Sequence, residues 1–261
     1  MKSWGIPATE RQLIFLNPGP LRQLLPSTIQ VSEIDHDPVP AQQATPFSTA
    51  ESTGLTDAVE QRRSEFLTTR RCAHEALATA GAPPAPLMRG PRGEPQWPAG
   101  WVGSLTHIGP TSAGRPTYRA AAVAAADRFA ALGIDAEEWA PLPHGTSGVI
   151  CTELELRSAE ALFPAATAQP MDRLVFSIKE SFYKARFPLT RTWLDFLDVE
   201  VDFGSVATRD AGVARAAGPM TGTFSVAVST PDRRHPALPD VLSGRFLIRA
   251  PLVVTAVMLE R

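Results

Sequence analysis

The sequence contains only two cysteines, Cys72 and Cys151, which are far apart and show no CxxC spacing. We therefore expect neither a disulfide framework nor a cysteine-based zinc site, and a reducing compartment is the default. No HExxH pair occurs, and no run of 18 apolar residues is free of charge or proline. With no apolar segment behind basic residues at the start, the sequence predicts a cytoplasmic protein without a signal peptide or a membrane span.

The chain also lacks an excess of either charge, because its formal net charge is −2. This argues against a protein that binds nucleic acid through its overall electrostatics, so any bound anion must be held by a local cluster of Lys and Arg. Hydrophobic residues make up 44% and charged residues 20%, a globular composition, and 25 prolines and 18 glycines predict many turns. At 261 residues the chain can form one large domain or two of ordinary size.

Helical patterns come early and strand patterns late within each half of the sequence, which predicts an α+β fold. Short edge strands are expected before residue 36 and a surface loop over residues 36–56. We expect helices over residues 58–80 (capped by Asp57 and Glu60), 152–162 and 176–187, the last ending before Pro188. Strands are expected over residues 101–107, 133–137, 199–203, 222–228, 244–248 and 252–259. The Ala-rich segment 119–132 fits either a helix or a short buried strand with a helical turn.

Asp135 and Glu137 lie two residues apart in an expected strand, so both carboxylates would point to the same side. Magnesium is usually held by one or two carboxylates together with substrate phosphates. An exposed acidic strand end, continuing into Glu138, is the simpler explanation of the pair taken alone.

The segment around Lys179, Glu180 and Lys184 carries a carboxylate and an ammonium group one helical turn apart. Such a pair could serve as metal ligand or base and as phosphate clamp or acid. Two simpler explanations compete with this one. Ser177 and Glu180 have the spacing of a capping box, and Glu180 with Lys184 could be an ordinary surface ion pair.

Two further segments could bind phosphate. Arg89 lies in a Gly- and Pro-rich turn that runs into the strand carrying Ser104, Thr106 and His107, and this combination offers several donors to phosphate oxygens. A structural histidine is the simpler explanation there, and Trp97 and Trp101 fit a core. The expected helix over residues 58–80 carries Arg62, Arg63 and Arg70, for which a solvated basic face is the alternative.

Four sequences in this order, RRSEFLTTRRCAHEAL, MRGPRGEPQWPAGWVGSLTHIG, GIDAE and FSIKESFYKARFPLT, resemble the 4'-phosphopantetheinyl transferase superfamily. The resemblance is to its EntD-like (Sfp-type) branch, including actinobacterial enzymes. It covers residues 58–193 well and the last strands more loosely. It implies two similar α+β halves related by a pseudo-two-fold axis, over residues 1–130 (nucleotide-binding segments) and 131–261 (metal-binding and catalytic segments), with the active site between them. A single chain then forms both walls of the cleft, which favours a monomer.

The resemblance also implies site residues. The metal ligands for Mg²⁺, or Mn²⁺ in its place, would be Asp135, Glu137 and Glu180. The coenzyme A contacts would be Arg62 (or Arg63 instead), Arg70, Arg89, Ser104, Thr106, His107, Lys179 and Lys184. The catalytic residues would be Glu180, as the base that deprotonates a serine directly or through water, with Lys184 and Asp135.

The implied reaction transfers the 4'-phosphopantetheine group of coenzyme A to a serine of an apo acyl, peptidyl or aryl carrier domain and releases adenosine 3',5'-bisphosphate. Siderophore, polyketide and nonribosomal peptide synthases are the expected clients. Two other classes use the same residues differently. They are a magnesium-dependent nucleotide phosphohydrolase and a non-catalytic protein that binds coenzyme A or a carrier.

Overall fold

The computed structural model describes residues 18–38, 45–53, 55, 58–109, 117–162, 169–208, 219–236 and 238–261. In chain order the elements are α1 (Pro20–Leu24), β1 (Gln30–Ile34), α3 (Ser48–Glu51), α4 (Glu60–Ala80), β2 (Trp101–Ile108), β3 (Tyr118–Ala125), β4 (Phe129–Glu138), α5 (Ser147–Ile150), α6 (Glu153–Ala161), α7 (Met171–Thr190), η2 (Phe196–Asp198), β5 (Val199–Thr208), β6 (Met220–Val228), η3 (Pro231–Arg233), β7 (Val241–Arg249) and β8 (Leu252–Glu260).

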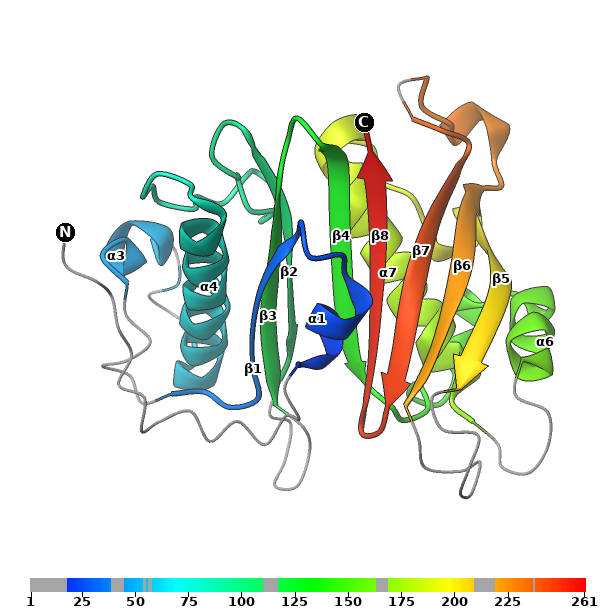
Figure 1. Ribbon diagram of the computed structural model, residues 1–261. Helices are drawn as coiled ribbons and strands as arrows, with labels where there is room; N and C mark the ends of the chain where they lie inside the picture. Colours follow the sequence, from blue (N-terminus) through cyan, green and yellow to red (C-terminus); the bar gives the residue numbers. More distant parts are fainter. Residues whose placement is uncertain are drawn as a thin grey trace.

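The strands form two antiparallel sheets, one of three strands in the order β1-β3-β2 and one of five in the order β4-β8-β7-β6-β5. Helix α4 packs on β3 and β1 of the smaller sheet, and α7 packs on β4 and β8 of the larger one. In Figure 1, α7 lies behind the five-stranded sheet and the short α1 crosses in front of it. The α+β fold expected from the sequence is therefore confirmed.

The two sheets meet where β2 runs beside β4, and side chains rather than a backbone ladder join them. The Ser104 hydroxyl accepts a hydrogen bond from the Ile134 amide at 3.0 Å, and the Thr106 hydroxyl accepts one from the Ala136 amide at 2.9 Å. The expected boundary between residues 130 and 131 falls inside β4, just after the chain has crossed from one sheet to the other. That division into halves stays a prediction.

The Ala-rich segment folds as two neighbouring strands, β3 and β4, so the helical alternative was wrong. Every residue of β3 from Tyr118 to Ala124 is buried. On one face Ala121 and Val123 pack with residues of α4, and on the other Ala120 and Ala122 join the core beneath α1. Small side chains allow both layers to approach the strand closely, and this packing outweighs the helix propensity of alanine.

Helix α7 differs from expectation at both ends, because it begins at Met171 and continues through Pro188 to Thr190. The buried Met171, Leu174 and Ile178 continue the core-facing stripe backward, which is a signal in the sequence that the expected start at residue 176 missed. Helix α4 begins at Glu60, and Asp57 lies outside the described residues.

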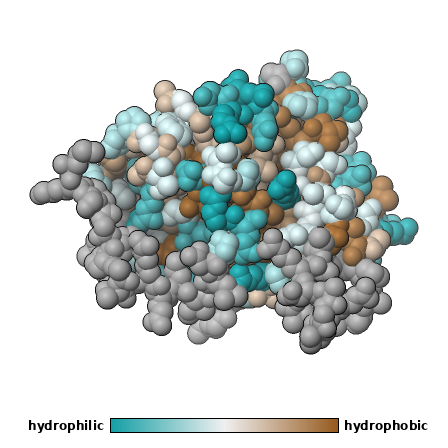
Figure 2. Space-filling view, viewed as in Figure 1, coloured by the Kyte–Doolittle hydropathy of each residue, from teal (hydrophilic) through white to brown (hydrophobic). Residues whose placement is uncertain are grey.

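Part of the segment expected as a surface loop is the short helix α3. One expected edge strand is present as β1, and the other, over residues 13–16, lies outside the described residues. Figure 2 shows this side of the molecule with hydrophilic and hydrophobic residues intermixed. No helix in the described ranges has the length and hydrophobicity that crossing a bilayer requires.

Candidate active site

Helix α7 lies very close to the larger sheet at Gly133 of β4. A Cβ atom added there would lie 1.9 Å from the Ser181 carbonyl oxygen and 2.6 Å from the Ala185 amide nitrogen, so no side chain fits. The helix backbone therefore rests directly on β4. This contact brings side chains of α7 within reach of Asp135, the next residue of β4 on the same face.

Asp135 is the centre of the site and is only 3% exposed. One carboxylate oxygen accepts a hydrogen bond from the Lys184 ammonium at 2.6 Å, and the other accepts one from the Ser177 hydroxyl at 2.8 Å. An exposed acidic strand end is therefore wrong for Asp135. The capping box is wrong too, because Ser177 lies within α7, well past its first turn.

The other two expected metal ligands lie in the electrostatic field of Asp135. Burial first, and then the charge of Asp135, raises the pKa of Glu137 to about 7, although Glu137 also forms an ion pair with Arg173 at 2.8 Å. The same two causes, in the same order, raise the pKa of Glu180, against the opposing charge of Lys184. Two half-buried carboxylates, Glu137 and Glu180, are thus each repelled by the buried Asp135.

Lys184 partly compensates this negative charge. Burial disfavours its charged form, but the charge and hydrogen bond of Asp135, followed by the charges of Glu180 and Glu137, outweigh burial and raise the pKa of the ammonium. The ammonium is thus positively charged at neutral pH. Its side chain is 31% exposed, so it can also reach a ligand in front of the site.

The chemistry of this donor set fits a divalent cation that prefers oxygen ligands, because all three groups are carboxylates and Asp135 repels the other two. The described side chains do not yet converge on one point, since no three of the described His, Cys, Asp and Glu residues are grouped to hold a metal ion. Instead Lys184 and Arg173 neutralise Asp135 and Glu137. A cation would have to displace the Lys184 ammonium from Asp135.

The strand β2 places His107 beside this cluster, exposed at the end of the strand. Loss of solvent around the ring, as the surrounding protein partly buries it, is the main cause that lowers the pKa of His107. The positive charges of Lys184 and Arg119 lower it further, and the charges of Glu65 and Asp135 oppose this. At neutral pH the ring is therefore neutral, with one nitrogen free to donate and one to accept.

The other two expected contacts of this strand, Ser104 and Thr106, are buried. Their hydroxyls bond to the backbone of β4 at the junction of the sheets. The structure thus gives them the role of joining the two sheets beside the site.

The expected phosphate-binding arginines fall into two groups. Arg62 and Arg63 are exposed near the start of α4, as a solvated basic face would be. Arg70 is only 3% exposed, lies 4.9 Å from the centre of the Phe66 ring, and is close enough to Arg89 for their charges to interact. Among the described residues its buried Nη1 has no hydrogen-bond partner. This unsatisfied donor makes Arg70, with the exposed Arg89, the better candidate for holding an anion.

Lys179 lies on the opposite face of α7 and has no exposed surface. Its ammonium is 2.9 Å from the Glu155 carboxylate and donates hydrogen bonds to the carbonyl oxygens of Ile150 and Phe196 at 2.8 and 2.9 Å. Glu155 also accepts the Val201 amide at 2.9 Å. This arrangement joins α5, α6, α7, η2 and β5, and it leaves the ammonium no donor for a phosphate.

Sequence reasoning missed the partners Glu155 and Arg173. Glu155 had a visible signal, because Thr152 and Glu155 have the spacing of a capping box, and the structure contains that box at the start of α6. Arg173 had no such signal in the sequence, because its ion pair with Glu137 depends on the first turn of α7, which the sequence pattern did not predict.

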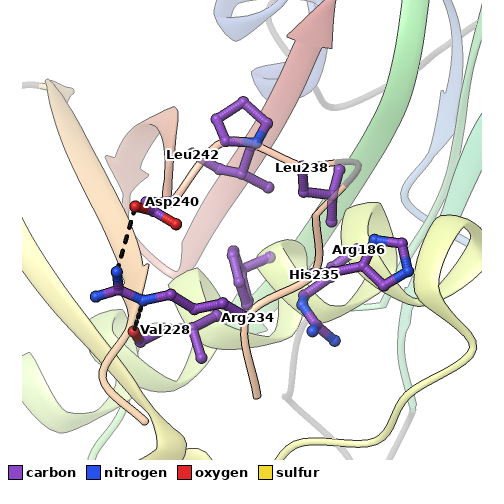
Figure 3. A pocket seen from close by; sticks show the side chains of 9 residues that line it. Arg186, Val228, Arg234, His235, Leu238, Asp240 and Leu242 are labelled. Atoms are coloured by element: carbon purple, nitrogen blue, oxygen red, sulfur yellow. Dashed lines mark hydrogen bonds and ion pairs between the residues drawn. The ribbon is translucent and has the colours of Figure 1, made fainter. Parts of the chain in front are cut away.

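Two hollows lie near α7. An open, mostly apolar groove extends beside the candidate site, with walls that include Trp97, Trp101, Leu132, Ala185 and Leu189. A second pocket, shown in Figure 3, lies between α7 and the β6–β7 connection and contains none of the expected site residues.

The lining of that second pocket is partly basic. Arg234 bonds to the Val228 carbonyl and to Asp240, and Arg186 donates to Thr190 and to the carbonyls of Thr192 and Arg233. These contacts give both arginines partners within the fold. We therefore place the candidate active site at the Asp135 cluster.

Comparison with known proteins identifies the family of the chain. Residues 50–124 match the model of the 4'-phosphopantetheinyl transferase N-terminal domain, and residues 131–227 match that of the 4'-phosphopantetheinyl transferase superfamily. The chain is 39% identical to the 4'-phosphopantetheinyl transferase PptT of Mycobacterium tuberculosis, over 77% of this chain and 81% of the relative.

Two further relatives are similarly close. The chain is 38% identical to Npt of Nocardia iowensis (80% of this chain, 87% of the relative) and 38% identical to Svp of Streptomyces mobaraensis (79% and 76%). Both carry the name 4'-phosphopantetheinyl transferase. The chain therefore belongs to the 4'-phosphopantetheinyl transferase superfamily.

Proposed function

We propose that this enzyme transfers the 4'-phosphopantetheine group of coenzyme A to a serine of an apo carrier domain at the Asp135 cluster. The observation that carries this proposal is the meeting of β4 and α7, where three carboxylates and the charged Lys184 face one another. Membership of the superfamily gives the reaction, and the Lys184–Asp135 contact supports this cluster as its place.

The negative diphosphate of coenzyme A would bind in front of this cluster, with Lys184 as its nearest cation. Asp135, Glu137 and Glu180 would hold Mg²⁺, and a bound Mg²⁺ would supply electrostatic stabilisation of the charge that develops on the phosphate oxygens. His107 would contact the nucleotide phosphates as a neutral donor. Arg70 and Arg89 would hold the phosphate at the adenosine end, because the unsatisfied Arg70 donor is buried there.

In the transfer step the serine oxygen attacks the phosphorus that carries the pantetheine arm, and the bond to the other diphosphate oxygen breaks. Adenosine 3',5'-bisphosphate leaves with that oxygen and its electron pair. Glu180 would accept the serine proton, a role that suits a half-buried carboxylate whose pKa is raised by burial and by the charge of Asp135. Lys184 would stabilise the negative charge on the departing oxygen.

One assay separates this function from its alternatives. The chain is incubated with coenzyme A, MgCl₂ and an apo carrier domain, and the carrier is then weighed by mass spectrometry. A mass gain of one phosphopantetheine group supports transfer. Release of product from coenzyme A with an unmodified carrier would indicate a phosphohydrolase, and no reaction would indicate a binding protein.

The metal requirement has its own test. Transfer should stop when a chelator removes divalent ions and should return with Mg²⁺, and also with Mn²⁺. A rate that is unchanged in chelator would remove the metal from this proposal and leave Lys184 and the arginines as the phosphate-binding groups.

Siderophore, polyketide and nonribosomal peptide carriers are proposed as substrates, to be ranked by comparing kcat/KM over a panel of apo carriers. A cytoplasmic monomer is also proposed. Both cysteines are free and buried, which suits a reducing compartment, and one chain supplies both walls of the site.

A further inference from the structure

We propose that Glu51 is a positioning residue that holds Arg70 and Arg89 in place for a phosphate at the nucleotide end of coenzyme A. This inference rests on the proposed function and concerns a residue that does not itself touch the donor. Glu51 ends α3, within the segment that the sequence pattern predicts as a surface loop. Its side chain nevertheless has no exposed surface, which is rare for a carboxylate.

The Glu51 carboxylate ties three separate segments together. Its Oε1 lies 2.7 Å from Nε2 of His74 on α4 and accepts a hydrogen bond from the Leu87 amide at 2.6 Å. Leu87 is itself fully buried and stands two residues before Arg89. Phe47, just before α3, packs against the His74 ring with 5.1 Å between ring centres. Glu51 thus fixes the base of the turn that carries Arg89 against the helix that carries Arg70.

Charge gives the same group of residues a second connection. Burial lowers the pKa of Arg70 to about 10, the charge of Glu51 opposes that fall, and the charge of Arg89 adds to it. Arg70 therefore stays charged at neutral pH, although it is buried and close to a second arginine. The charge of Glu51 thus offsets the repulsion that Arg70 experiences from Arg89.

Both charged partners also retain hydrogen-bonding capacity. Among the residues that the structure describes, Nη1 of Arg70 and Oε2 of Glu51 are buried and have no hydrogen-bond partner. An unsatisfied buried guanidinium N–H is costly, and phosphate oxygens are the acceptors that guanidinium groups bind best. Arg89 is exposed and can donate to the same anion from the solvent side. The arrangement fits one phosphate group between a buried arginine and an exposed one.

The test is a binding measurement that needs no carrier and no turnover. Titration calorimetry gives the Kd of coenzyme A and of 3'-dephospho-coenzyme A for the intact chain and for Glu51→Gln. Glutamine keeps the shape and an oxygen acceptor but removes the charge. We expect Glu51→Gln to weaken coenzyme A binding about tenfold and 3'-dephospho-coenzyme A binding less than about twofold, so the preference for the 3'-phosphate shrinks.

Two further variants complete the design. Glu153→Gln removes an exposed carboxylate of α6, whose side chain is 79% exposed, and should leave both Kd values unchanged. Glu51→Asp keeps the charge on a shorter side chain and should lose part of the preference. If Glu51→Gln does not fold, the ratio of Kd values in Glu51→Asp decides.

The proposal is overturned if a Glu51 variant weakens the binding of both donors by the same factor, as a purely structural role would. It is also overturned if the variant changes neither Kd. An intact chain that binds both donors equally well overturns it too. Because binding is measured without a carrier, the two proposals can fail separately. If the protein binds coenzyme A but modifies no carrier, the proposed function is rejected, and the Kd values still decide the role of Glu51.

Discussion

Two lysines five residues apart on α7 have opposite surroundings. Lys184 is partly exposed and bonds to Asp135 at the candidate active site, whereas Lys179 is fully buried and bonds to Glu155 in the interior. Five residues correspond to about 500° of helical rotation, so the two side chains leave α7 in directions well over a right angle apart. The carboxylate partners differ as well, because Asp135 has two further carboxylates near it and Glu155 is surrounded by backbone donors and Lys179.

The difference shows which charges a protein can use for chemistry. The interior pair satisfies its hydrogen bonds within the fold, so its energy goes into holding five elements together. The Asp135–Lys184 pair instead lies beside Glu137 and Glu180, whose pKa values are raised first by burial and then by the charge of Asp135. A bound cation would relieve that unfavourable charge interaction. The following predictions test this contrast.

The largest expected effect is on the interior pair. Lys179→Met should lower the free energy of unfolding by about 3–5 kcal/mol in urea denaturation, because it leaves the buried Glu155 carboxylate without its cation. The double variant Lys179→Met/Glu155→Gln should recover part of this loss, since glutamine keeps an acceptor for the Val201 amide without the charge. A stable Lys179→Met with weakened coenzyme A binding would instead support the phosphate contact expected from the sequence.

A large effect on catalysis, with little effect on stability, is expected at Glu180. Glu180→Gln should lower the transfer rate at least about 100-fold at saturating coenzyme A and Mg²⁺, because glutamine cannot accept the serine proton. Its unfolding free energy should not fall, since the buried carboxylate already carries an unfavourable charge interaction with Asp135. Near wild-type rates would contradict the assignment of Glu180 as the base.

Replacing Lys184 should strengthen metal binding and slow transfer. Lys184→Met removes the ammonium that bonds to Asp135, so Mg²⁺ affinity measured by titration calorimetry should rise about tenfold. The transfer rate should fall, because a phosphate-binding cation is lost. The control Arg157→Met, at an exposed position on α6, should change neither. A weaker Mg²⁺ affinity in Lys184→Met would place the metal away from Asp135.

The smallest expected effect concerns pH. In the absence of divalent ions, folded Glu137 keeps its proton up to about pH 7, whereas the unfolded carboxyl loses it near 4.5. The folded state binds more protons in that window, so stability should fall as pH rises from 5 to 8, by on the order of 1 kcal/mol. Glu137→Gln should flatten this slope in urea denaturation at several pH values. An identical slope in the variant would exclude Glu137 as its cause.

The sequence predicts those parts of the site that depend on local spacing. The period of two along β4 puts Asp135 and Glu137 on one face. The charge of Asp135 accordingly raises the pKa of Glu137. The period of 3.6 along α7 puts Glu180 and Lys184 together near Asp135. The class of fold follows from the alternation of such periods and could be predicted as well.

The remaining features depend on contacts between distant segments. Whether alanine at positions 120–124 forms a helix or a strand is decided by the layers above and below it, which the sequence does not display. The burial of Lys179 depends on Glu155, which is 24 positions earlier and on another helix. The role of Glu51 similarly depends on Leu87, 36 positions later. Local patterns locate chemical groups, and long-range packing determines which of them stay accessible.

The bare backbone at Gly133 has a consequence for how this enzyme tolerates change. Adding one methyl group there would lift α7 away from the strand and would carry Glu180 and Lys184 out of range of Asp135. Reactivity at such a site declines steeply with displacements of about 1 Å. The variant Gly133→Ala would still contain every polar group named above. Its transfer rate would test whether these groups are sufficient for the reaction when their spacing is changed.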